Sequence, residues 1–276
     1  MSDLLTRTAE ATPKEKPSRR QRRKPKKTGT IQVWLGRAAL VVIVLGGWEL
    51  LVGTGSLDAQ FVGQPSGVWD SLTRMLASGE LVAPTLDTLW ATLLALLIAV
   101  PSGILAGLVL AEVPFLDKVI SPFLIPVNSL PRIAFAPLFL LWFGLTIWSK
   151  VFLAVSIVFF MMLFNTRAGV KGVQPDQLAV VKTLGLKRHE VMWKVALPSA
   201  VPSIAAGVRL SVTYSLLGVV ASEMVSAKQG LGLSVVSFSN SFDINSMLAV
   251  LVVMAVIATV FGLIAEKGEQ WLLRWE

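Results

Sequence analysis

Side chains that could carry out chemistry are scarce in this sequence of 276 residues. It contains no cysteine and one histidine, His189, so it offers neither thiolate ligands nor a cluster of imidazoles for a metal ion. The GxxxxGK[ST] phosphate loop is absent, as are the GxSxG and HExxH motifs. We therefore expect no enzyme, no metal site, no cofactor bound by this chain, and a plain surface role for His189.

Two of the charged residues within apolar sequence are candidate pathway residues. Arg132 lies in a proline-rich apolar stretch, and a charge at the centre of a membrane costs about 3 kcal/mol. It is either a pathway or gate residue that faces a cavity, or a shallow residue whose side chain reaches the membrane surface. Glu223 is either a gate residue close to a solute or an interfacial residue held by a cap or an ion pair.

A further polar group follows one helical face. Ser211 and Ser215 share that face with Gly207 by fourfold spacing, and Tyr214 is adjacent. These residues could line a polar route, although small residues at this spacing also explain simple helix packing. The candidate pathway residues are Arg132, Ser211, Tyr214, Ser215 and Glu223.

The elements that must position these residues are membrane helices. Hydrophobic residues make up 54% of the chain and charged residues 15%, against about 25% charged residues in soluble domains. A membrane helix needs about 20 mostly apolar residues. Six stretches qualify, the third being interrupted by prolines (Pro122, Pro126, Pro131 and Pro137): 33–53, 86–111, 119–143, 147–165, 203–225 and 246–265. We expect an all-α membrane protein with six transmembrane helices, the first within 31–56.

The positive charge of the chain is concentrated at its start. Residues 1–30 hold ten Lys/Arg and three Asp/Glu, and we expect them to form a disordered tail. The tail could anchor the topology or contact anionic lipid, and no aromatic residues accompany its charges as nucleic-acid binding would favour. With the tail in the cytoplasm, the inner segments hold 19 Lys/Arg and the outer segments two. The positive-inside rule therefore places both termini in the cytoplasm.

Small residues form a stripe along the second apolar stretch. They recur every fourth residue, on one face of a helix, at Ala91, Ala95, Ala99, Gly103, Gly107 and Ala111. Small side chains let helix backbones approach closely in lipid. This face should therefore pack against another helix, within the subunit or across a dimer.

The longest inner connection, residues 166–202, carries a helical pattern of its own. A first short helix is expected after Pro175, and Gly185 is placed to end it in a left-handed turn. A second helix is expected from about Lys187 to Ala196, ending before Pro198. The apolar face of the first helix either docks on a partner or folds back on the bundle.

At these residues the sequence resembles the membrane-spanning permease of binding-protein-dependent ABC importers, in the branch for nitrate, sulfonates, taurine and bicarbonate. The resemblance covers about 57–276. In the inner loop, Gly185, Val195, Leu197 and Pro198 have the spacing of the family's coupling motif, whose EAA triplet is replaced by Ala179, Val180 and Val181. Further landmarks are Gln64–Ser66, Pro131–Leu138, Trp142–Gly144, Asn165–Thr166, Gly207–Arg209, Ala221–Glu223 and Gly230–Gly232.

The resemblance implies a type I importer permease in the inner membrane, with 57–276 as its core and 166–202 as its ATPase-coupling loop. It implies that a separate ATP-binding subunit, which holds ATP and Mg, grips the loop at Ala179, Val180, Val181, Lys182, Thr183, Leu184, Gly185, Val195, Leu197 and Pro198. It also implies a second permease subunit, giving a homodimer, and a periplasmic or extracellular solute-binding protein. The expected cargo is a small solute such as a sulfonate-, nitrate- or taurine-like anion. A secondary carrier or channel without an ATPase is the alternative.

Overall fold

The computed structural model describes residues 30–173, 183–225 and 227–274, and the regular structure within these ranges is helical. The chain divides into two compact units, Met1–Gly46 and Gly47–Glu276. The described part of the first unit is the beginning of α1 (Thr30–Gly53), an apolar helix whose side chains are largely exposed there. The rest of the predicted basic tail lies outside the described residues.

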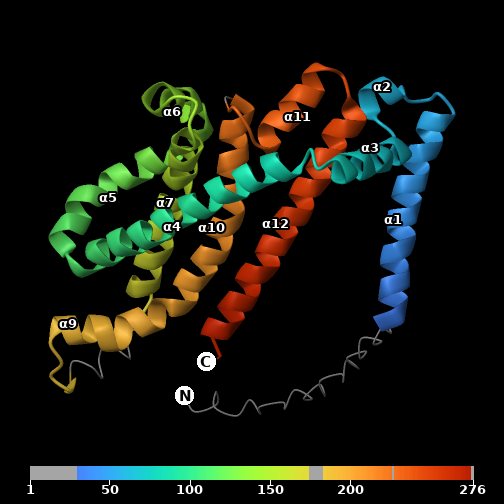
Figure 1. The fold of residues 1–276 in the computed structure, drawn as a ribbon. Helices are drawn as coiled ribbons and strands as arrows, with labels where there is room; N and C mark the ends of the chain where they lie inside the picture. Colours follow the sequence, from blue (N-terminus) through green and yellow to red (C-terminus); the bar gives the residue numbers. More distant parts are fainter. Residues whose placement is uncertain (1–29, 174–182, 226, 275–276) are drawn as a thin grey trace, which may run out of the picture. The chain divides into compact units, whose positions relative to one another are not determined.

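The second unit contains the end of α1 and all the later helices (Figure 1). These are α2 (Ala59–Val62), α3 (Pro65–Ser78), α4 (Val82–Glu112), α5 (Pro114–Ser129), the 3-10 turn η1 (Arg132–Phe135), α6 (Ala136–Phe143), α7 (Ile147–Lys171), α9 (Arg188–Val191), the π-helical turn η2 (Met192–Ala196), α10 (Leu197–Val225), α11 (Leu231–Asn240) and α12 (Ile244–Leu272).

Five described helices are long and apolar enough to cross a membrane: α1, α4, α7, the continuous helix His189–Val225 and α12. The helix α5 and the segment η1–α6 make a sixth span if they are counted as one, although they meet at a bend of 84°. The expected all-helical fold with six spans therefore matches the structure. This bent span is not one straight helix, because the chain turns sharply between α5 and η1.

Prolines break this span at one place only. The helix α5 runs through Pro122 and Pro126, so the prediction that these two residues interrupt it is wrong. The break lies at Leu130, whose extended conformation (φ −64°, ψ 135°) is the one that a following proline favours. After Pro131 the chain makes η1, and Pro137 then sits in the first turn of α6, where a missing N–H costs no helical bond.

The helix α7 packs along both α4 and α10, and the stripe of small residues makes the α4 contact possible. A methyl group on Gly103 would lie 2.6 Å from Cβ of Met162, and one on Gly107 would lie 2.7 Å from Cβ of Thr166. The alanines Ala91, Ala95 and Ala99 are fully buried in the same contact region. Ala111, at the far end of the stripe, packs beside the cluster that contains Val170. The stripe thus joins helices within one subunit.

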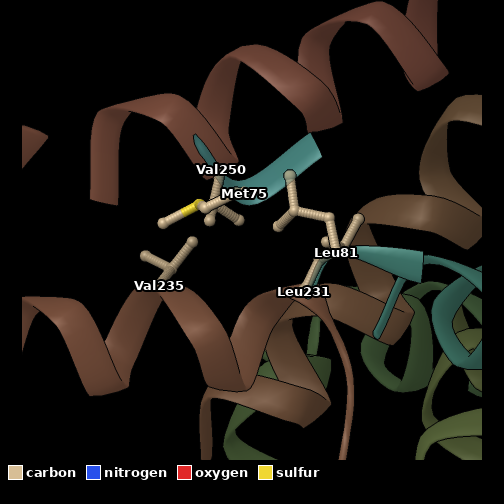
Figure 2. Packing of buried hydrophobic residues seen from close by; sticks show 5 residues of the cluster. All are labelled: Met75, Leu81, Leu231, Val235 and Val250. Atoms are coloured by element: carbon tan, nitrogen blue, oxygen red, sulfur yellow. The ribbon is translucent and has the colours of Figure 1, made fainter. Parts of the chain in front are cut away.

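A small apolar cluster joins the connections at one end of the bundle. Met75 of α3, Leu81 before α4, Leu231 and Val235 of α11, and Val250 of α12 converge there (Figure 2). The helix α3 is amphipathic and packs its buried side on α12. These connections are therefore packed parts of the fold.

The predicted end of a helix before Pro198 is wrong. The helix continues from α9 through η2 into α10, and Pro198 lies in the first turn of α10. The backbone N–H of Leu197 donates to Met192 O in the wider π-helical pattern. A proline has no N–H to donate, so a change of hydrogen-bonding register directly before Pro198 lets the helix pass through it.

Candidate translocation cavity and coupling loop

A cavity of about 570 Å³ opens beside the broken span. Three parts of the fold line it: the break between α5 and η1, the middle of α7, and the middle of α10. The lining residues are Asn128, Leu130, Arg132, Ile133, Ile157, Met161, Phe164, Asn165, Tyr214, Leu217 and Gly218. The cavity is therefore mostly apolar, with four polar side chains, and its volume lies in the range of small-molecule sites, about 300–1,000 Å³.

Arg132 is held at this cavity by neutral oxygens and an aromatic ring. Its guanidinium donates to Ser156 O, to Val127 O at 3.3 Å and to Asn128 Oδ1 at 3.2 Å. The carbonyl of Val127 has no helical partner four residues later, because Pro131 lacks an N–H. The ring of Phe160 lies 4.1 Å from the guanidinium carbon, a cation–π contact. The helix break thus supplies part of the site that accommodates the charge.

Tyr214 is the second candidate pathway residue that the structure brings to the cavity. It lies on α10 and is about half exposed, as is its neighbour Leu217. On α7, Asn165 donates to Met161 O at 2.9 Å. Arg132 and Tyr214 therefore face one space, although 82 positions separate them in the sequence.

Ser211 and Ser215 are buried in helix contacts, away from the cavity lining. Ser211 Oγ donates to Gly207 O at 2.8 Å within α10, and Ser215 Oγ donates to Thr92 O of α4 at 3.2 Å. A methyl group on Gly207 would lie 3.0 Å from Cβ of Asn165. In this structure, the face that these residues share serves helix packing.

Glu223 lies in a separate buried charge cluster. Its carboxylate accepts hydrogen bonds from Lys150 Nζ at 3.0 Å and from Thr88 Oγ1 at 2.9 Å. Glu223 is fully buried and Lys150 is 4% exposed. Lys150 also pairs with Asp87 and donates to Gln229 O at 3.0 Å. The cluster joins α4, α7 and α10 near the end of the bundle where α11 begins.

The start of α11 depends on the same carboxylate. Gly232 N–H donates to Glu223 Oε2 at 2.9 Å, and Leu231 N–H donates to Thr88 Oγ1 at 3.0 Å. A carboxylate at a helix N-terminus satisfies free N–H groups and complements the helix dipole. Gly230 has φ +137° and lies directly against Glu223, with no room for a side chain. This contact explains why Glu223, Gly230 and Gly232 occur together.

The described part of the predicted coupling loop, α9 and η2, lies at the opposite end of α7 and α10 from α6 and α11 (Figure 1). Gly185 has φ +70°, so its predicted left-handed conformation is confirmed. Leu184 beside it is 70% exposed, and Trp193 of η2 is 64% exposed. The motif residues Ala179, Val180, Val181 and Lys182 lie outside the described residues. Thr183, which ends this gap, has a helical backbone.

The base of the loop is tied firmly to the bundle. Val195 packs on the apolar cluster of Val170, Val173, Ala196 and Ala200, while Leu197 and Pro198 are partly buried at the start of α10. On the other side, Asp117 of α5 pairs with Arg167 at 2.6 Å and with Lys171, near the end of α7. The described loop thus has a fixed base and an exposed tip.

Sequence reasoning missed the partners Asp87, Thr88 and Lys150, and the exposed Trp193. One residue in the sequence indicates this cluster, namely Lys150, because a lysine just inside an apolar span needs a carboxylate as its partner. The two carboxylates that it meets, Asp87 and Glu223, are 63 and 73 positions away, so the pairing depends on the fold. Trp193 lies in the π-helical turn, which the sequence pattern did not predict.

Comparisons with known proteins agree with this architecture. A family profile described as "Binding-protein-dependent transport system inner membrane component" matches residues 99–273. Among solved structures, an inward-facing MetNI methionine ABC transporter shares the fold, with a TM-score of 0.55 and 15% identity over 75% of this chain and 94% of that chain.

Three relatives show the range of this family. The taurine transport system permease protein TauC of Escherichia coli (strain K12) is 28% identical over 88% of this chain and 90% of its own length. The riboflavin transport system permease protein RibX of Chloroflexus aurantiacus is 29% identical over the same shares. The formylaminopyrimidine transport permease protein ThiX of Halalkalibacterium halodurans is 27% identical over 82% of this chain and 92% of its own length. Since the profile match covers more than half of the chain, the protein belongs to the family of binding-protein-dependent transport system inner membrane components, as a multi-pass permease subunit of the cell inner membrane.

Proposed function

We propose that this chain forms the transmembrane route for a small solute and that ATP hydrolysis on a separate subunit drives the transport. The observation that carries this proposal is the exposed loop tip at Gly185, which lies in the connection between the end of α7 and the start of α10. Two exposed apolar side chains, Leu184 before Gly185 and Trp193 after it in the sequence, offer a docking surface. The ATP-binding subunit, with its ATP and Mg, would bind there.

The sidedness of the proposal follows from charge. The loop, both termini and most Lys/Arg would face the cytoplasm. The layer of α3 and α11 would then face outward, where a solute-binding protein delivers its cargo. We propose two copies of the chain in the complex, because the cavity at Arg132 is open on one side and a second permease would enclose it.

The structure offers a mechanical link between the loop and the cavity. The ion pairs of Asp117 with Arg167 and Lys171 join the start of α5 to the end of α7. The same α5 ends at the break beside Arg132. A shift of the loop base would therefore move the broken span as a rigid body and change access to the cavity. Coupling of this kind requires that nucleotide and solute favour different arrangements.

A small organic anion is the proposed cargo. Support comes from the cationic Arg132 at the cavity and from the taurine relative, since taurine carries a sulfonate group. The riboflavin and formylaminopyrimidine relatives show that the family also carries other solutes.

Replacement of Gly185 by valine tests the docking surface. Valine at φ +70° strains the backbone and adds bulk at the loop tip, so uptake and solute-stimulated ATP hydrolysis should fall at least about tenfold while the subunits still assemble. Gly79 is a matched control, because it has φ +74° with open space around it and lies at the other end of the bundle. Gly79→Val should retain uptake. Normal coupled transport by Gly185→Val would overturn the proposal.

A further inference from the structure

We propose that the cavity beside the broken span binds the anionic group of the solute, a sulfonate or a carboxylate, and that Arg132 selects for its negative charge. This inference rests on the proposed function in one respect, namely that the cavity lies on the transport route. It adds the site, the chemical group that is recognised and the residue that recognises it.

The first observation is that no Asp or Glu among the described residues pairs with Arg132. Within the part of the chain that the structure describes, its partners are two backbone carbonyls, one amide oxygen and an aromatic ring. Other cations of the spans are neutralised: Lys150 by Glu223, and Arg209 by Glu269 at 3.1 Å. A positive charge that is partly removed from water and lacks a carboxylate attracts a mobile anion strongly.

The second observation concerns the cavity wall. Among the described residues that line it, none is Asp or Glu. The polar groups beside Arg132 are the amides of Asn128 and Asn165 and the hydroxyl of Tyr214, which can donate hydrogen bonds to an anion. The field in the cavity is therefore that of one positive charge with neutral donors around it.

The third observation is that the guanidinium of Arg132 is held in place while some of its N–H groups remain available as hydrogen-bond donors. The ring of Phe160 covers one face of it, and its hydrogen bonds use Nη1 and Nη2. A guanidinium has more N–H groups than these three bonds require. The three bonds take both N–H groups of Nη2 and one of Nη1, so an oxyanion could accept from Nε–H or from the second Nη1–H without displacing these partners.

The rest of the wall indicates what accompanies the anionic group. Ile157, Met161, Phe164 and Leu217 present apolar surface. A solute with one anionic end and a small apolar body would match the charge and the apolar wall together, whereas an inorganic anion would leave the apolar wall unmatched. The site therefore favours alkyl sulfonates or short carboxylates.

Cysteine labelling can measure the charge preference directly, because the chain has no native cysteine. Leu217→Cys places a single thiol in the cavity wall, at a side chain that is 57% exposed. The full-length protein, purified with its partner subunits in lipid nanodiscs, is treated with two methanethiosulfonate reagents of similar size. One carries an ethylsulfonate and the other an ethyltrimethylammonium group. We expect the ratio of anionic to cationic labelling rates to be higher at this thiol than at a reference thiol outside the cavity, because comparison with a reference thiol removes the difference in intrinsic reactivity between the reagents.

Substitution of Arg132 assigns the preference to this residue. In Leu217→Cys/Arg132→Gln the ratio of anionic to cationic labelling rates should fall about tenfold, because a nearby unit charge acts with opposite sign on the two reagents. Arg132→Lys should keep the ratio close to its original value. Ser239→Cys, on α11 and outside the cavity lining, is the reference thiol, and its ratio should not respond to Arg132→Gln.

Competition gives a second readout in the unsubstituted background. Ethanesulfonate should slow labelling of Leu217→Cys, and the uncharged ethyl methyl sulfone should not; this comparison holds even if Arg132→Gln does not assemble. Equal anionic-to-cationic ratios at Leu217→Cys and at the reference thiol, or a ratio that does not change with Arg132→Gln, would overturn the inference. The labelling requires neither ATP nor the binding protein, so a failure of ATP coupling alone would leave its result intact and would count only against the proposed function.

Discussion

The carboxylate of Glu223 has three partners in one buried place. It neutralises Lys150, accepts a hydrogen bond from the hydroxyl of Thr88 and accepts another from the N–H of Gly232, in the first turn of α11. Removing one member of a buried ion pair leaves an uncompensated charge, which costs far more than the pair itself contributes. The cluster is therefore a constraint on the fold at this end of the bundle.

Lys150→Met should destabilise the protein strongly, because it leaves the carboxylate of Glu223 buried without a cation. We expect a loss of about 3–5 kcal/mol. Lys150→Met/Glu223→Gln, in which both charges are absent, should recover part of that loss. Thermal unfolding of the detergent-solubilised protein measures the three variants, with Glu223→Gln alone as the third. A double variant less stable than Lys150→Met would argue against the ion pair.

Sequence alone ranked Arg132 and Glu223 as equal candidates, because both are charges within apolar spans. The structure separates them by their partners. Glu223 meets Lys150 and Thr88, which are 73 and 135 positions away, whereas Arg132 meets local carbonyls and a cavity. A sequence pattern shows that a buried charge needs a partner, but only the packing of α4, α7 and α10 shows which one it finds.

At the scale of elements, close approach of α4 and α7 follows from the glycines in their contact. A side chain on Gly107 would meet both the side chain of Thr166 and the carbonyl of Leu163, at 2.7 and 2.8 Å. The neighbouring atoms belong to the α7 backbone or lie close to it, so they cannot move aside without separating the helices. Such overpacking costs about 1–3 kcal/mol.

Gly107→Ala should therefore lower the unfolding temperature, although alanine favours a helix more than glycine does. Gly262→Ala in α12 is the matched control, because no atom lies within 4 Å of the added methyl group. There the helix propensity acts alone and should stabilise the protein by up to about 1 kcal/mol. The two substitutions are chemically identical, and unfolding curves should shift in opposite directions. A higher unfolding temperature for both variants would show that the α4–α7 contact tolerates a methyl group.

The sequence predicts a helix well where apolar or small residues recur periodically, and poorly where the prediction depends on a single proline. The long apolar stretches and the fourfold stripe on α4 are periodic signals, and the structure has helices at both. The predictions made at Pro122, Pro126 and Pro198 are wrong, because a proline shows only that one backbone N–H is missing. Whether the helix then ends or changes register, as it does at η2, depends on the surrounding packing.

At the scale of the molecule, the two ends of the second unit differ in kind. One end holds the packed layer of α3 and α11 over the buried charge cluster, and the other holds the exposed loop tip at Gly185. An importer driven from inside requires such a difference, because the ATP-binding subunit and the solute-binding protein approach from opposite sides. The positive-inside pattern predicts that the loop faces the cytoplasm, and the alternation of the spans then predicts that the α3–α4 connection faces outside.

Two single-cysteine variants test this orientation. Glu80→Cys lies in the exposed α3–α4 connection and Leu184→Cys lies at the loop tip. A membrane-impermeant maleimide added to intact spheroplasts should label Glu80→Cys at least about tenfold faster than Leu184→Cys, since one intact bilayer separates the reagent from the loop. Inside-out vesicles should reverse the order, which controls for intrinsic thiol reactivity. If the loop thiol reacts first in spheroplasts, Gly185 faces the outside, where no nucleotide-hydrolysing subunit could reach it, and the proposed coupling fails together with the topology.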